Sequence, residues 1–133
     1  MASNLKLNHI VFLVIVGVLG WVVPGAGHLA INKKVHSIII FITIAITFAV
    51  GLYIGSIAVI DPKGSTSWYA AQIMNSPAVV LLGHISASKG SHVYSRPAEI
   101  GQIYTSITGL LNLLCIINAV YWAHLDKIKS HVQ

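Results

Sequence analysis

The feature that most constrains this chain is an uncharged stretch from Ile38 to Ile60, which begins shortly after Lys33 and Lys34. As a helix, its 23 residues would be about 35 Å long, because a helix rises about 1.5 Å per residue. The hydrocarbon core of a bilayer is about 30 Å thick. A soluble helix would need a polar face, and this stretch has none. The stretch therefore predicts a membrane-spanning helix.

The composition points the same way. Of the 133 residues, 56% are hydrophobic and only 8% are charged, whereas soluble domains carry about 25% charged residues. A chain of this length predicts a single membrane domain covering residues 1–133, with the lipid bilayer as its first partner. The formal charge of +5 is expected at lipid headgroups. No basic cluster alternates with aromatic residues, so nucleic-acid binding is not expected.

The breakers in the sequence divide it into spans. Pro24-Gly25 and Asp61-Pro62 each interrupt a long apolar stretch. We predict an all-α integral membrane protein with three transmembrane helices at about 9–23, 35–60 and 100–124. The stretch 68–87 has a short apolar core and a break near Pro77, which predicts a re-entrant or interfacial helix pair; a fourth span is the alternative. The adjacent charges of Lys33 and Lys34 favour a cytoplasmic position for their loop.

The most distinctive local motif is the turn that follows the first span. It consists of Pro24, Gly25, Gly27 and His28, with Ala26 between the glycines. Proline ends a regular helix, and glycines permit unusual backbone dihedrals and close approach. His28 is a candidate for binding a headgroup, a proton or a metal, and the plainer interpretation is an interfacial histidine that caps the turn.

Two stretches carry a resemblance to known families. The stretch WVVPGAGHLAINKKVHSIIIF resembles the hairpin of the two-transmembrane-helix domain family. The stretch GQIYTSITGLLNLLCIINAVYWA resembles the end of a small bacterial membrane protein family of unknown function, which pairs a PGxGH turn with a C-terminal GLLNLL helix. That family follows the helix with Asp-Ala, whereas this chain has Asn118-Ala119. The resemblance implies a bacterial inner (cytoplasmic) membrane location and implies no reaction.

Small and polar residues recur at helical spacing in the predicted spans. Small residues let helices approach closely, and buried amides and hydroxyls form bonds between helices. Packing inside the chain and docking against a partner are both open for the glycines. For the polar stripe, bonding between helices and the lining of a substrate path are both open. The predicted helix-packing residues are Gly17, Gly20, Gly51, Gly55, Thr105, Thr108, Gly109 and Asn112.

The histidines raise the possibility of a haem or chlorin. A bis-histidine haem needs two imidazoles from different helices at matching depth. With three spans, His28, His36 and His124 all fall near one membrane face and could meet this condition. None lies deep in a span and no ligand pair has a short fixed spacing, so we expect neither a cofactor nor a metal.

No catalytic motif is recognisable, so no catalytic residue is assigned and the chain is not expected to be an enzyme. The favoured function is a small structural or accessory subunit of a larger membrane protein complex. Its partners would be other integral membrane subunits or a second copy. The alternatives are a haem- or pigment-binding electron-transfer subunit and a self-assembling channel or carrier.

Overall fold

The computed structural model describes residues 2–56, 59–62, 64, 66–88 and 96–132. In this part of the chain there are helices and no strands, which confirms the all-α prediction. The helices are α1 (Ala2–Val22), α2 (Ala26–Ala30), α3 (Lys34–Gly55), α4 (Thr66–Ile73), α5 (Ala78–Ser88) and α6 (Arg96–Val132).

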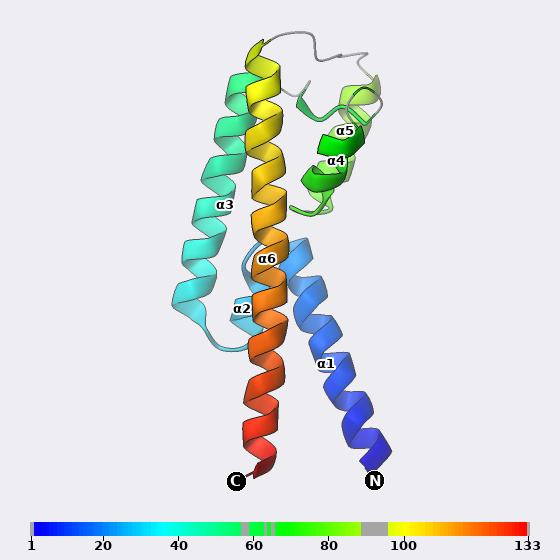
Figure 1. Cartoon of the computed structure of the whole chain (residues 1–133), viewed down its shortest axis with the longest axis vertical. Helices are drawn as coiled ribbons and strands as arrows, with labels where there is room; N and C mark the ends of the chain where they lie inside the picture. The colour runs from blue at the N-terminus through cyan, green and yellow to red at the C-terminus, as the bar shows by residue number, and fades with distance from the viewer. Residues whose placement is uncertain (1, 57–58, 63, 65, 89–95, 133) are drawn as a thin grey trace.

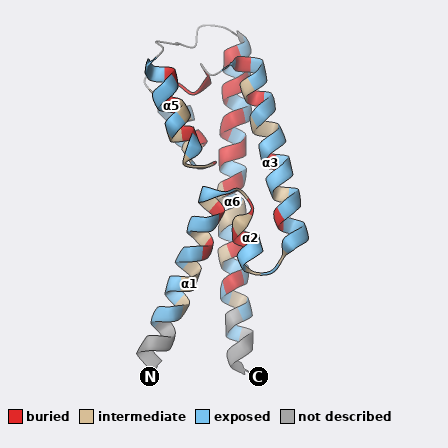
Figure 2. Ribbon diagram, turned by 180° about the vertical axis from the view of Figure 1, so that it is seen from behind, coloured by how far each residue is buried: buried red, intermediate tan, exposed pale blue. Residues whose placement is uncertain are grey.

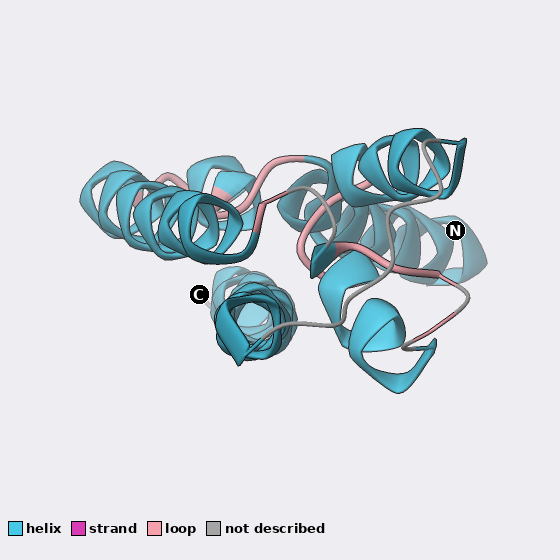
Figure 3. Cartoon of the chain, turned by 90° about the horizontal axis from the view of Figure 1, so that it is seen from above, coloured by secondary structure: helices cyan, strands magenta, loops and turns pink. Residues whose placement is uncertain are grey.

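The last helix, α6, is the central element (Figure 1). It has 37 residues, which corresponds to a length of about 55 Å. Helices α1, α2, α3 and α4 all contact it, and α3 runs antiparallel to it. Figure 3 looks nearly along its axis and shows the other helices beside it. Figure 2 shows buried residues concentrated on α6, whereas α1 and α3 are mostly exposed.

Within the described residues, two helices are long and apolar enough to cross a membrane. They are α3, Lys34–Gly55, and the stretch Pro97–Asp126 of α6. Only 17% and 33% of their most apolar windows are buried, unlike the core helix of a soluble protein. The apolar part of α1, Leu7–Val22, is shorter, so the expected third span at 9–23 is not established.

Helix α3 ends earlier than the expected boundary at residue 60. It stops at Gly55. The next residue, Ser56, has a positive φ of 62°, which is incompatible with a right-handed helix. The chain then folds back, so that a Cβ placed on Gly55 would overlap the side chain of Val59. Val59 and Ile60 are fully buried in this connection. An apolar sequence is expected both for a membrane span and for a buried connection. The predicted span therefore extended to residue 60, five residues beyond the end of α3.

The upper part of α3 lies against α6 through glycines on both helices. A Cβ on Gly51 would come within 3.1 Å of the carbonyl oxygen of Gly101. A Cβ on Gly101 would come within 2.6 Å of the carbonyl oxygen of Gly51. These backbones can approach closely only because neither position has a side chain. Gly51 and Gly55 are therefore packing residues inside the chain and do not face outward.

Two helical hairpins meet beside the middle of α6. One is α1 followed by the Pro24-Gly25 turn and α2; the other is α4 followed by residues 74–77 and α5 (Figure 1). Helix α1 ends where α4 also ends, and the indole nitrogen of Trp21 donates to the carbonyl oxygen of Ile73 at 3.0 Å. The two hairpins thus approach the same level of α6 from opposite ends of the molecule.

The glycines differ in how much they tolerate a side chain, which gives a matched test. A Cβ on Gly109 would overlap the carbonyl oxygen of Ala71, whereas a Cβ on Gly17 would meet Val120 at an ordinary 3.7 Å. We expect Gly109→Ala to destabilise the protein by about 1–3 kcal/mol, because overpacking would displace the backbone of α4. Gly17→Ala should leave stability equal or slightly raised, since alanine favours a helix over glycine. Unfolding in detergent micelles measures both, and equal effects would contradict the packing described.

Candidate functional site

The polar residues of α6 bond with the ends of the two hairpins. Asn112 is fully buried, and its Nδ2 lies 3.2 Å from the carbonyl oxygen of Gly20, 3.1 Å from that of Met74 and 2.8 Å from that of Asn75. The last carbonyls of a helix have no partner within that helix. One amide therefore bonds with the C-terminal end of α1 and the turn that follows α4, and so joins three helices.

The two predicted threonines lie one to two turns earlier on α6. The Thr105 hydroxyl donates to the carbonyl oxygen of Gly101 at 2.9 Å and accepts from Nε2 of Gln72 at 2.7 Å. Thr108 donates to the carbonyl oxygen of Thr105 at 2.6 Å. All three side chains are fully buried. Thr105 thus links α6 to α4, and Gln72 is a contributor that the sequence patterns did not single out.

The turn after α1 is shaped by its glycines. Gly25 has a φ of 85°, and a Cβ there would lie 2.6 Å from the carbonyl oxygen of Ser37. The Ser37 hydroxyl donates to the carbonyl oxygen of Gly25 at 2.8 Å, which fastens the turn to the start of α3. A Cβ on Gly27 would come within 3.1 Å of the Ala119 Cβ. The turn therefore lies tightly between α3 and α6, and this position directs His28 toward both helices.

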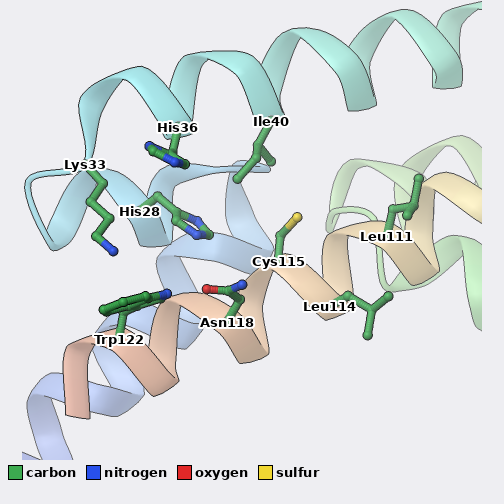
Figure 4. A pocket seen from close by; sticks show the side chains of 9 residues that line it. All are labelled: His28, Lys33, His36, Ile40, Leu111, Leu114, Cys115, Asn118 and Trp122. Carbon is green, nitrogen blue, oxygen red and sulfur yellow. The ribbon is translucent and has the colours of Figure 1, made fainter. Parts of the chain in front are cut away.

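A cavity of about 370 Å³ opens between α2, α3 and α6 (Figure 4). Its polar residues lie at one end, where the Lys33 ammonium is 3.4 Å from the centre of the Trp122 ring. Such a cation–π contact holds the charge on a ring face. The cavity is lined by His28, Lys33, His36, Ile40, Leu111, Leu114, Cys115, Asn118 and Trp122.

His28 is the most buried polar group of this cavity, with 5% of its surface exposed. Its pKa is lowered from the usual 6.5, first by burial and then by the electrostatic effects of His36 and Lys33. The imidazole is therefore neutral near neutral pH, and one ring nitrogen carries a hydrogen that can be donated. This arrangement can offer a neutral donor beside the Lys33 side chain.

The histidines considered for haem do not all meet. His28 and His36 line the same cavity, but His124 does not. Instead, Nδ1 of His124 lies 2.9 Å from Nε2 of His9, in a contact between α6 and α1. Among the described residues there is no group of three histidine, cysteine or acidic side chains placed to hold a metal ion.

Two cavity residues were missed as site candidates in the sequence. Trp122 is a typical membrane-interface residue, and Lys33 belongs to a basic pair that marks a loop. Their contact joins positions 89 residues apart, so no local pattern could show it. The one feature of the sequence that could have suggested this contact is that Lys33 and Trp122 are both predicted to lie near the same membrane face.

The lowered pKa of His28 predicts a pH-dependent stability. Below pH 6.5 the unfolded chain binds a proton at this position more readily than the folded chain, so stability should fall as the pH is lowered. We expect His28→Gln to lose less thermal stability than the wild type between pH 8 and pH 5.5, measured in detergent micelles. His84→Gln, which changes an exposed histidine on α5, is the control and should retain the wild-type pH dependence. Parallel curves for wild type and His28→Gln would contradict the assignment.

Comparison with known proteins gives one match. Residues 15–131 match a family of unknown function, DUF6677; the match covers α2 to α5 completely, nearly all of α6 and the last eight residues of α1. No curated protein and no solved structure matches the chain. The match includes both the PGxGH turn and the helix that carries Asn112, and the chain belongs to the DUF6677 family of proteins of unknown function.

Proposed function

We propose that this chain is a small, non-enzymatic accessory subunit that packs against other integral membrane proteins in a bacterial inner membrane. In this proposal, α3 and the stretch 97–126 of α6 span the bilayer. Their length, apolar composition and largely uncovered surfaces support this placement. The bacterial location rests on the family resemblance of the turn and the last helix.

The two hairpins would enter this membrane only halfway. Asn112 is eleven residues from Gly101 at one end of the α3–α6 contact and ten residues from Trp122 at the other, or about 16 Å from each. This places Asn112 near the centre of a bilayer whose core is about 30 Å thick. Hairpin ends in hydrocarbon need partners for their free carbonyls, and Asn112 supplies them.

The proposal rests above all on the outward face of α3. The buried residues of this helix form a narrow stripe toward α6, made of Ser37, Ile44, Gly51 and Gly55. Most of the other side chains are exposed and apolar, and the hydroxyls of Thr43 and Thr47 bond to carbonyls of their own helix. Ala45 and Ala49 are exposed one turn apart, away from α6. Small residues at this spacing let a partner helix approach closely.

The electron-transfer subunit remains a second candidate because His28 and His36 line one cavity. A Soret absorption band in the purified protein would be its signature. The channel or carrier hypothesis has less support, since Thr105, Thr108 and Asn112 are fully buried and bonded within the chain.

The accessory role predicts a high-mass complex after mild-detergent extraction. We expect Ala45→Leu with Ala49→Leu to reduce the fraction in this complex about tenfold or more, because overpacking a helix contact costs about 1–3 kcal/mol. Ile39→Phe enlarges a side chain on another exposed side of α3 and should leave the complex intact. Native electrophoresis measures the mass. A folded monomer as the only extracted form of the wild type would refute the proposal.

The two-span topology places both chain ends on one side of the membrane. Helix α1 begins and α6 ends at the same end of the molecule (Figure 1), and the Lys33-Lys34 connection, beside Trp122, lies in the same half of the molecule. By the positive-inside rule, this end faces the cytoplasm. Green fluorescent protein fused to either terminus should therefore fluoresce, whereas alkaline phosphatase inserted after Gly64 should be active. Fluorescence at only one terminus would indicate an odd number of spans.

A further inference from the structure

We propose that the cavity between α2, α3 and α6 binds one anionic phospholipid. The headgroup phosphate would lie near Lys33 and His36, and part of one acyl chain would lie along Ile40, Leu111 and Leu114. This inference is independent of whether the chain joins a larger complex, because every residue that carries it belongs to this chain.

The first argument is the order of the lining residues along the axis of α6. Trp122 and Asn118 line the polar end, with Lys33 above the Trp122 ring. Leu114 and Leu111 line the other end, about 16 Å from Trp122 for the eleven residues between positions 111 and 122. A cavity that changes from polar at the membrane surface to apolar toward its centre has the polarity profile of a phospholipid.

The second argument is charge. The lining contains one lysine and two histidines and no acidic residue. Lys33 rests on a ring face, so its ammonium keeps hydrogens for an anion, and it forms no ion pair with a described carboxylate. Basic pockets between membrane helices are the usual binding sites of anionic headgroups. A zwitterionic headgroup would place a second positive charge beside Lys33, which the site disfavours.

The third argument is shape. The cavity volume of about 370 Å³ lies within the usual range of ligand sites, about 300–1,000 Å³. Its apolar end is formed by exposed side chains, Leu114 at 62% and Leu111 at 41%, so it is open to the surrounding lipid. A headgroup and the first part of one chain can occupy it while the second chain stays in the bilayer. Inorganic phosphate would use only the polar end.

Native mass spectrometry tests the proposal on the whole protein in a mild nonionic detergent. The probe is an equimolar mixture of phosphatidylglycerol and phosphatidylcholine with identical chains. We expect one bound phosphatidylglycerol per chain and little phosphatidylcholine. Lys33→Gln should reduce the bound phosphatidylglycerol about fivefold or more, the effect of one lysine on an anionic headgroup. Lys34→Gln removes the neighbouring charge, which does not line the cavity, and should change binding less than twofold.

A second variant tests the apolar end. Leu114→Trp, at an exposed position, should fill this end and lower phosphatidylglycerol binding while leaving the thermal unfolding temperature without lipid unchanged. Inorganic phosphate alone should not raise that temperature, whereas phosphatidylglycerol should. Equal retention of the two lipids, or equal effects of Lys33→Gln and Lys34→Gln, would overturn the proposal. Full stabilisation by inorganic phosphate, unaffected by Leu114→Trp, would overturn the lipid in favour of a free anion.

Discussion

The bonds of Asn112 are the interaction on which the rest of the structure depends. Two helices, α1 and α4, end beside the middle of α6, and each helix end leaves carbonyl groups without partners. Water can satisfy such groups at a surface, but hydrocarbon cannot. The Asn112 amide bonds with both ends at once. A single side chain on the central helix thereby allows two interrupted helices to end inside the molecule.

The glycines make this arrangement sterically possible. Gly109, one turn before Asn112, brings α4 so near that its backbone would collide with any added side chain. Gly101 does the same for α3 at the other end of the contact. At the turn, Gly25 and Gly27 let α2 lie between α3 and α6, which places His28 in the wall of the cavity. Close approach and polar bonding thus occur together along one face of α6.

Much of the helical layout could be predicted from the sequence, because apolar length and proline or glycine breakers are local signals. The break between α4 and α5 coincides with the stretch around Pro77, and the turn after α1 contains Pro24 and Gly25. The end of α3 at Gly55 could not be predicted from the sequence. The residues that follow it are apolar because they are buried in a connection, and a continuing membrane helix would be equally apolar. The cavity could not be predicted from the sequence either, because the contact of Lys33 with Trp122 joins positions that are far apart in the chain. Which small residues face α6 is also decided by tertiary packing, because Gly51 faces α6 whereas Ala49 faces outward.

The position of α6 after all of its partner helices has a consequence for biogenesis. Every helix that contacts α6 is synthesised before it, and these helices have few contacts with one another beyond those between sequence neighbours. Until α6 has been synthesised, α1 and α4 lack the partner for their terminal carbonyls. The newly made hairpins therefore keep unpaired terminal carbonyls until α6 is present. The bundle therefore closes in one late step, when α6 arrives.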